Sequence, residues 1–238
     1  MPDPLSIALS GLTASRLRAL THANNIANIN TPGYKAQRAD SATGPSGDMV
    51  RISAIGRNQS MGFLRPTDNP MDVAIDGPGF FQVQDAQGNI LYTRAGSFQV
   101  DAEGNLTTSE GLTLVPPVVI PAGAQVSIAP DGTVSAQVGD APPEIVGQIQ
   151  LATFNNPEGL ALTANGLAAA TPASGPPILG TPGTNGLGRL VPGFLESSNV
   201  DIAAELIAQK FETKIYAANA AIVRTVDEMN REVIDLLA

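Results

Sequence analysis

Apolar side chains near the start of the chain recur at steps of three and four residues, the spacing of one helix face. Asp3 is placed to cap this helix and Pro4 to open it, where proline is tolerated. Thr31-Pro32-Gly33 would end it, because a residue before proline avoids helical geometry. The stripe consists of Leu5, Leu9, Leu12, Ala19, Ala23 and Ile26, widened by Leu17 and Leu20.

The stretch from Val200 to Leu237 carries a longer stripe and contains neither glycine nor proline. Ser198-Asn199-Val200-Asp201 supplies a start that resembles a capping box. At about 1.5 Å per residue the helix would be roughly 55 Å long, and a helix of this kind needs partners along its length. The seam positions are Ala208, Ile215, Ile222, Met229 and Leu236, then Ala204, Phe211, Ala218 and Thr225, with Val226 and Val233 broadening the stripe. We expect the two terminal helices to pack through these stripes.

Between the helices the pattern changes to short strands and tight turns. Asp72–Asp76 alternates and Phe80–Gln84 is strand-like. Two similar turns, residues 85–89 and 101–105, predict hairpins in which glycine supplies a positive φ. Asp131-Gly132 predicts a third hairpin, and Glu144–Phe154 a further strand. Residues 171–193 are rich in glycine and proline and are expected to be extended or looped.

The fold class predicted is therefore α+β, with long N- and C-terminal α-helices forming a coiled-coil-like pair around a mostly antiparallel β central domain. We assign residues 1–35 and 198–238 to a terminal helical domain and residues 70–197 to a β-rich outer domain. Residues 36–69 are expected to be an irregular linker, with 43–47 as a loop.

Composition narrows the function. The chain has 238 residues, a formal net charge of −9, 4% aromatic residues and no tryptophan. An acidic surface repels phosphates and aromatic stacking platforms are scarce, so nucleic acid is not expected as a partner. The chain has no cysteine, which excludes disulfides and thiolate metal sites. The start lacks the features of a cleavable signal peptide, and we expect no segment to enter a bilayer.

Candidate chemistry is sparse. His22 is the only histidine and is expected to have a surface or packing role rather than to bind metal. Residues 85–89 suggest a calcium loop, but its twelfth position would be Gly96 rather than glutamate, so the hairpin is favoured. Asp72 and Asp76 share a strand face, yet nothing else supports a glycosidase pair. We predict no catalytic, cofactor or metal residues.

Four segments carry a resemblance to a known family. They are ANNIANINTPGYK (23–35), DNPMDVAIDGPGFFQVQ (68–84), YTRAGSFQVDAEGNL (92–106) and PGTNGLGRLVPGFLESSNVD (182–201). In this order they resemble the signatures of the flagellar basal-body rod and hook protein family. The overall match is best to distal rod members, with proximal rod subunits as the nearest alternative.

The resemblance implies a structural subunit of the flagellar rod rather than an enzyme. Such a subunit assembles through its terminal helices into the helical tube that transmits motor torque to the hook. Its implied partners are itself, other rod and hook subunits and the flagellar export apparatus. It would lie in the periplasm-spanning rod after export without a cleavable signal peptide. The alternatives are a proximal rod or hook-type subunit, and a secreted cell-wall-directed enzyme.

Two interpretations remain open for Asn24, Asn25 and Asn28: a turn and cap at the helix end, or hydrogen bonds between subunits. Tyr34 and Lys35 would either anchor the following loop or be exposed. The residues predicted to mediate assembly are Leu5, Leu9, Leu12, Asn24, Asn25, Asn28, Tyr34, Phe211, Ile215, Tyr216, Ile222, Met229 and Leu236.

Overall fold

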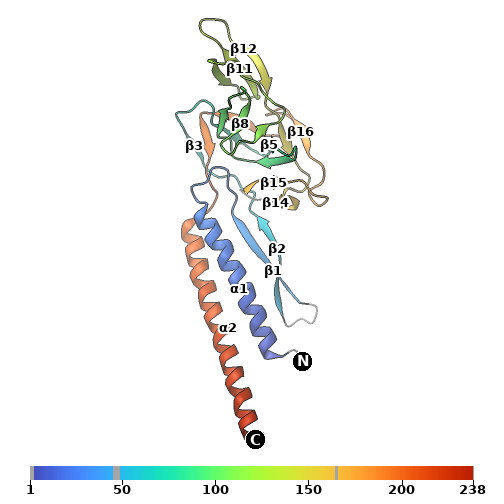
Figure 1. Cartoon of the computed structure of the whole chain (residues 1–238), viewed down its shortest axis with the longest axis vertical. Helices are drawn as coiled ribbons and strands as arrows, with labels where there is room; N and C mark the ends of the chain where they lie inside the picture. The colour runs from blue at the N-terminus through green and yellow to red at the C-terminus, as the bar shows by residue number, and fades with distance from the viewer. Residues whose placement is uncertain (1–2, 45–48, 164–165, 238) are drawn as a thin grey trace. The chain divides into compact units, whose positions relative to one another are not determined.

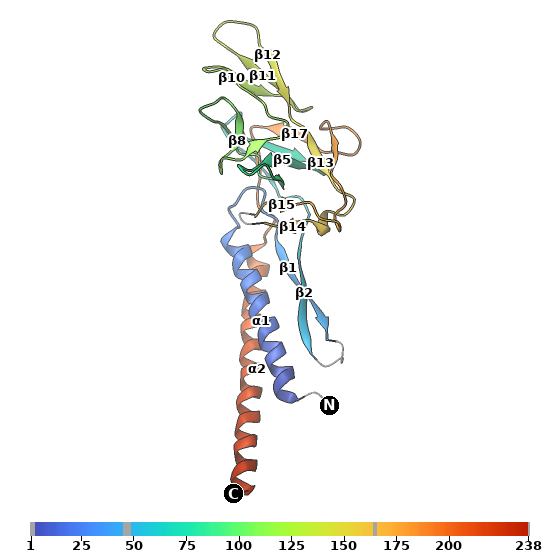
Figure 2. The same ribbon diagram turned by 45° about the vertical axis from the view of Figure 1, so that its right-hand side comes forward.

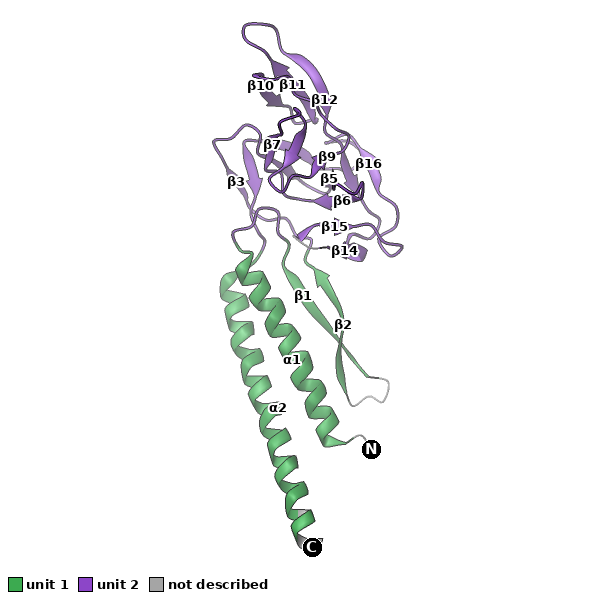
Figure 3. Ribbon diagram, viewed as in Figure 1, with its two compact units in different colours: residues 1–29, 35–58, 200–238 green, residues 30–34, 59–199 purple. Residues whose placement is uncertain are grey.

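The computed structural model describes residues 3–44, 49–163 and 166–237, except for the side chains at 233, 236 and 237. The chain divides into two compact units (Figure 3). The helical unit draws on residues 1–29, 35–58 and 200–238, and the β unit on residues 30–34 and 59–199. An α+β chain with a helix at each end and an antiparallel centre is therefore confirmed.

Helix α1 spans Pro4–Ala27 and begins as predicted. The Asp3 side chain accepts a hydrogen bond from the Leu5 backbone N–H at 3.2 Å, and Pro4 occupies the first turn. The helix ends at Asn28, earlier than the expected Thr31-Pro32-Gly33 stop. Asn28 donates its amide to the Asn24 carbonyl at 2.9 Å and so closes the last turn.

Helix α2 spans Ile202–Leu237. The Asp201 carboxylate accepts hydrogen bonds from the backbone N–H groups of Ala203 and Ala204, at 2.9 and 3.2 Å. Asp201 therefore caps the helix and also places a negative charge at its positive end.

A β-hairpin completes the helical unit, and it corrects the expectation that residues 36–69 are irregular. Strand β1 (Gln37–Thr43) pairs antiparallel with β2 (Val50–Arg57), and both strands contact α1 (Figures 1 and 2). The expected loop at 43–47 falls mostly outside the described residues, because residues 45–48 are not described.

The β unit is built from short antiparallel strands. They are β3 (Leu64–Pro66), β4 (Val73–Asp76), β5 (Phe80–Gln84), β6 (Ile90–Thr93), β7 (Phe98–Val100), β8 (Leu106–Thr108), β9 (Thr113–Leu114), β10 (Gln125–Ile128), β11 (Thr133–Gln137), β12 (Glu144–Gln148), β13 (Leu151–Thr153), β14 (Ala161–Leu162), β15 (Ala168–Ala169), β16 (Ile178–Gly180), β17 (Arg189–Pro192) and β18 (Phe194–Glu196). A short 3₁₀ turn, η1, covers Pro157–Gly159. The largest sheet runs β14-β15-β6-β5-β9-β8-β7, and β13 joins β5 to β16.

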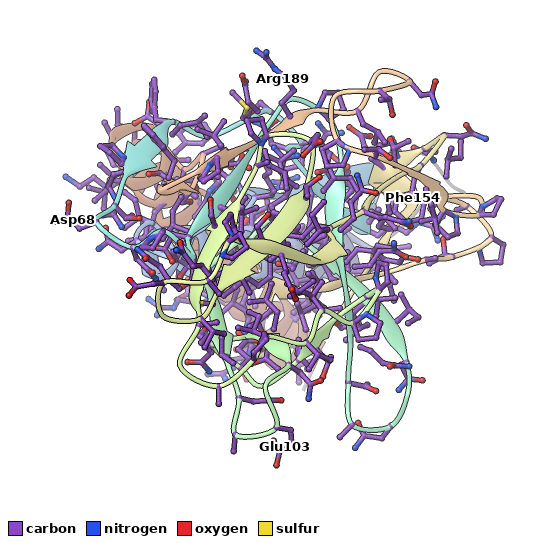
Figure 4. The ribbon with its side chains drawn as sticks, turned by 90° about the horizontal axis from the view of Figure 1, so that it is seen from above. Asp68, Glu103, Phe154 and Arg189 are labelled. Atoms are coloured by element: carbon purple, nitrogen blue, oxygen red, sulfur yellow. The ribbon has the colours of Figure 1, made fainter. Side chains whose placement is uncertain are left out.

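The core of the β unit is apolar and closed. Phe81 is fully buried and meets Phe98 edge-to-face at 5.1 Å between ring centroids. A second cluster gathers Phe80, Tyr92 and Phe154, whose ring is labelled in Figure 4. Burial of these rings and aliphatic side chains favours a β unit that folds around its own core.

Two turns of the β unit repeat the same hydrogen-bonded design, as the sequence predicted. The Asp85 carboxylate accepts from the N–H groups of Gln87 and Asn89 and from the Asn89 amide, all within 2.9 Å. Asp101 does the same toward Glu103 and Asn105. Figure 4 shows Glu103 at the tip of the second turn. These carboxylates therefore stabilise the turns of the hairpins β5–β6 and β7–β8.

The third predicted hairpin, at Asp131-Gly132, joins β10 to β11 and is also confirmed. The strand predicted over Glu144–Phe154 is instead two strands, β12 and β13, which belong to different sheets. Residues 171–193 contain β16 and β17 rather than loop alone, and β17 pairs with β4.

One buried ion pair ties distant segments of the β unit together. Arg94 donates to Glu196 at 2.8 Å and also to the carbonyls of Gly77, Gly79 and Ile75. Both side chains are almost fully buried. Breaking such a pair leaves an uncompensated charge inside the protein, so Arg94 and Glu196 depend on each other.

Candidate assembly surface

The two long helices run antiparallel in a coiled-coil-like register (Figures 1 and 2). Gly11 packs on Asn219, Arg18 pairs with Glu212 at 3.6 Å, and the Asn25 amide donates to Glu205 at 2.9 Å. Each step of seven residues along α1 is therefore matched by seven residues backward along α2. This heptad spacing is that of a left-handed helix pair.

The side chains in this seam differ from the prediction. We expected the apolar stripes to face each other. Ala208, Ile215 and Val226 of the α2 stripe are half-buried, but the seam also uses glycine, amide and charged side chains. Gly11 leaves so little room that an added Cβ would lie 2.8 Å from the Asn219 side chain. The Asn219 side chain therefore packs directly on Gly11, and polar pairs lie further along the seam.

The apolar stripe of α2 consequently faces outward. Phe211 is 63% exposed and Met229 is 59% exposed, and Ala218 and Ile222 are exposed between them. We call Phe211, Ala218, Ile222 and Met229 the α2 ridge. At about 100° per residue the ridge lies roughly a quarter-turn from the seam residues Glu205 and Glu212.

The outward stripe of α1 is less continuous. Leu9 and Leu20 are 48% and 55% exposed, whereas Leu5 and Leu12 are half-buried. Neither the β1–β2 hairpin nor α2 covers Leu9 or Leu20 fully. Both helices of the unit thus present large apolar side chains to solvent.

The end of α2 extends past α1. Continuing the heptad register places Pro4 opposite Val226, so the residues from Asp227 onward have no α1 residue beside them. At about 1.5 Å per residue this overhang is roughly 16 Å long. It carries Met229 and the exposed Ile234. Within the overhang Arg231 pairs with Asp227 at 2.9 Å, and the apolar side chains of the overhang have no α1 residue to pack on.

Comparison with known proteins agrees with this geometry. Residues 5–35 match the family described as "Flagella basal body rod protein", residues 74–136 the "Flagellar hook protein FlgE/F/G D1 domain", and residues 191–236 the "Flagellar basal body rod FlgEFG protein C-terminal". The chain is 38% identical to the flagellar basal-body rod protein FlgG of Buchnera aphidicola subsp. Acyrthosiphon pisum, over 96% of this chain and 97% of the relative.

The chain belongs to the flagellar basal-body rod protein family. It is also 37% identical to FlgG of Agrobacterium fabrum, over 94% of this chain and 95% of the relative. Identity to the rod protein FlgF of Escherichia coli is 33%, over 87% of this chain and 86% of the relative. This rod protein is a structural subunit and not an enzyme, so the cell-wall enzyme alternative is wrong.

The predicted assembly residues of the rod protein divide into two groups. Leu9, Phe211, Tyr216, Ile222 and Met229 are exposed on the helices and are available to a neighbour. Leu5, Leu12 and Ile215 are half-buried. The side chain of Leu236 lies outside the described side chains.

The asparagines of α1 act within the chain. Asn25 is fully buried, and its side chain bonds both the N–H and the carbonyl of Gln37 at 2.8 Å, besides Glu205. Asn24 and Asn28 form the helix-end turn, which confirms that interpretation for this pair. Asn25 thus fixes the hairpin and α2 to the end of α1.

Tyr34 and Lys35 are buried as well, at 8% and 5% exposure. The Tyr34 carbonyl accepts from the Asn199 backbone N–H at 3.4 Å. These two residues therefore anchor the segment that follows α1, which agrees with the first of the two interpretations given for them.

Sequence reasoning missed the polar seam. Arg18 and Glu212 were not singled out, and no contact with α1 was assigned to Glu205 or Asn219, because charged residues on a helix usually face solvent. One pattern could have found them: Glu205, Glu212 and Asn219 recur at heptad spacing, as do Gly11, Arg18 and Asn25. Matched heptads of small and polar residues indicate a second helix face with a partner.

Other candidate chemistry is accounted for within the rod protein. His22 pairs with Glu205, so its role is packing of the helices. Asp72 is buried whereas Asp76 is exposed. Among the described residues no group of three His, Cys, Asp or Glu side chains could hold a metal ion. None of the described helices is both long and apolar enough to cross a membrane.

Proposed function

We propose that this rod protein polymerises through its helical unit into the tube of the distal rod, which transmits torque to the hook. The observation that carries the proposal is the α2 ridge, a continuous apolar stripe that the chain's own packing leaves in water. Burial of one such large side chain contributes about 1.5–3 kcal/mol. Several ridge contacts repeated in every subunit would hold a polymer together.

The β unit also supports the proposal that the helical unit makes the contacts of the polymer. Fourteen of its apolar side chains form one buried core that does not depend on a neighbour, although Phe63 and Ile145 are exposed. The helical unit supplies the contacts between copies. The partners proposed are further copies of this chain and the adjoining rod and hook subunits.

We further propose that the subunit passes through the flagellar export apparatus unfolded, without a cleavable signal peptide. The chain has no cysteine, so no disulfide can hold it folded during passage. In this proposal α1 and α2 are mobile in the free subunit and become ordered on assembly. Hydrogen exchange of a dilute monomer tests this point: full protection of both helices would contradict it.

Assembly is tested by sedimentation velocity over a concentration series of the full chain, with electron microscopy of the pellet. Ala218→Asp places a charge on the ridge, and Ala217→Asp is its matched control, because Ala217 is also exposed but points about 100° away. We expect polymers from the wild type and from Ala217→Asp, but not from Ala218→Asp.

Circular dichroism should show equal helix content in both variants, since the substitution is chemically the same. The proposal is wrong if Ala218→Asp polymerises like the wild type. It is equally wrong if the wild type stays monomeric even when preassembled rod fragments are added as seeds.

A further inference from the structure

A groove of about 400 Å³ lies between α1 and α2, and its lining includes apolar side chains, the polar side chains of Ser15, Gln209 and Thr213, and the charged side chains of Arg16 and Glu212. Ala19 and Leu20 of α1 and Tyr216 of α2 supply apolar surface. Leu20 and Tyr216 are each about half exposed, at 55% and 47%. The groove therefore offers uncovered apolar area inside the helical unit.

The same groove contains two buried hydrogen-bond acceptors that no described residue satisfies. They are Oε1 of Gln209 and Oε2 of Glu212, both with almost no exposed surface. Glu212 is only 7% exposed, and its other oxygen lies 3.6 Å from Arg18, beyond hydrogen-bond distance. A buried carboxylate oxygen without a donor is costly, so an incoming donor would be bound strongly.

A suitable donor stands on the opposite side of α2. Lys214 is exposed and lies beside the α2 ridge, three residues after Phe211 and four before Ala218. None of the described carboxylates forms an ion pair with Lys214. Its long apolar stem allows the ammonium to reach past apolar contacts to a carboxylate below them.

We propose that the α1–α2 groove receives the α2 ridge of a second copy, with the Lys214 ammonium of that copy bonded to Glu212 and Gln209. Phe211 and Ala218 of the incoming ridge would cover Leu20 and Tyr216. This inference rests on the proposed function, since it names the contact through which the helical units assemble.

The positions of the two surfaces favour a second copy as the occupant. At about 100° per residue, Gln209 and Tyr216 lie roughly 150° around α2 from the ridge, and Glu212 lies roughly 100° from it. Each subunit therefore carries one free groove and one free ridge that point in different directions. A contact between unlike surfaces does not close on itself as a dimer does, and its repetition generates a helical polymer.

The test is a charge exchange across this contact, read out as the critical concentration for polymerisation of the full chain. Glu212→Lys and Lys214→Glu should each raise that concentration on the order of tenfold or more, as for loss of one charge-assisted hydrogen bond. The double variant should return to within about threefold of the wild type.

Mixing gives a second readout that a folding defect cannot imitate. A 1:1 mixture of the Glu212→Lys and Lys214→Glu chains restores opposite charges at every contact of an alternating polymer. Neither chain should polymerise well alone, but the mixture should. If the double variant and the mixture both fail to improve on the single variants, the inference is wrong.

One further variant separates a change in net charge from the loss of this contact. Arg224→Glu makes the same change in net charge at an exposed position about 80° away from Lys214, and it should polymerise normally. A loss in Arg224→Glu equal to that of Lys214→Glu would overturn the inference. The proposed function fails separately, by the behaviour of Ala218→Asp.

Discussion

The two units of this rod protein place their apolar side chains in opposite ways. In the β unit Phe81, Leu106 and Leu114 are fully buried in a common core. In the helical unit Phe211, Met229 and Leu20 are more than half exposed, while Asn25 and Glu212 are buried. The β unit therefore has a large apolar core, whereas the helix pair buries polar side chains and leaves much of its apolar surface in water.

This arrangement lets different side chains set the helix register and contact neighbouring subunits, which a wholly apolar seam would not do. The polar seam sets the register of α1 on α2 through Gly11, the Arg18–Glu212 pair and the Asn25–Glu205 hydrogen bond. Polar contacts specify a register better than uniform apolar ones, because a shifted register leaves them unsatisfied. The apolar side chains then remain available for neighbouring subunits.

The largest effect expected from this comparison is on the stability of the β unit. Phe81→Ala removes a fully buried ring that packs on Phe98, and should lower the free energy of unfolding by about 3–5 kcal/mol. Phe211→Ala makes the same chemical change on the exposed ridge. It should change monomer stability by no more than about 0.5 kcal/mol.

Urea unfolding of dilute monomer, followed by tyrosine fluorescence, measures both variants. Sedimentation at high concentration should show the reverse ranking, with assembly impaired by Phe211→Ala. If Phe211→Ala instead destabilised the monomer as much as Phe81→Ala does, the ridge would be part of an internal core and the contrast between the units would disappear.

Patterns within one element could be predicted well from the sequence. The caps of α1, the Asp-x-x-Gly-Asn turns and strand β5 depend on residues that are near one another in the chain. The pairing of the short strands in the β unit was only partly predicted, because pairs such as β17 with β4 join residues more than a hundred positions apart.

The helix seam was missed for a different physical reason. A stripe shows that a helix has an apolar face but does not say whether that face is covered by the same chain or by another copy. Here the α2 stripe was predicted both to pack on α1 and to mediate assembly; Ile215 is half-buried, whereas Phe211, Ile222 and Met229 are exposed. The hairpin β1–β2 was overlooked although Val50, Ile52 and Ile55 hinted at it, since Gly44 and the residues after it were interpreted as a loop only.

An intermediate effect should come from widening the polar seam. Gly11→Leu places a side chain where even a Cβ would lie 2.8 Å from Asn219, so the helices must separate or shift. Overpacking of this kind costs about 1–3 kcal/mol. Thr13→Leu adds the same side chain at an exposed position of α1 and serves as the control.

In the assembled polymer, amide hydrogen exchange of α1 and α2 should accelerate in Gly11→Leu, while amides of the β unit keep their protection. Equal exchange in Gly11→Leu and Thr13→Leu would mean that the close contact at Gly11 does not set the helix spacing. The comparison between units would then lose its structural basis in the seam.

The smallest effect concerns the turns of the β unit at low pH. The Asn89 side-chain amide, with backbone N–H groups of the turn, lowers the pKa of Asp85 below its usual 3.8, and the Asn105 amide does so for Asp101. Because both pKa values are lower in the folded state, the stabilisation is complete above about pH 3.8. It is lost as the pH falls through the lowered values.

Urea unfolding at a series of pH values between 7 and 2.5 should therefore show a decline below about pH 3.8 that is shallower in Asp85→Asn/Asp101→Asn than in the wild type. Glu103→Gln, at the tip of the turn of residues 101–105, is the control, and its stability should depend on pH as that of the wild type does. The helical unit carries neither carboxylate, so its hydrogen exchange at pH 3 should be the same in the double variant and the wild type. A difference in the hydrogen exchange of the helical unit would show that the two units do not respond independently. If the double variant and the wild type lost stability to urea identically as the pH falls, these turns would add nothing measurable to the stability of the β unit.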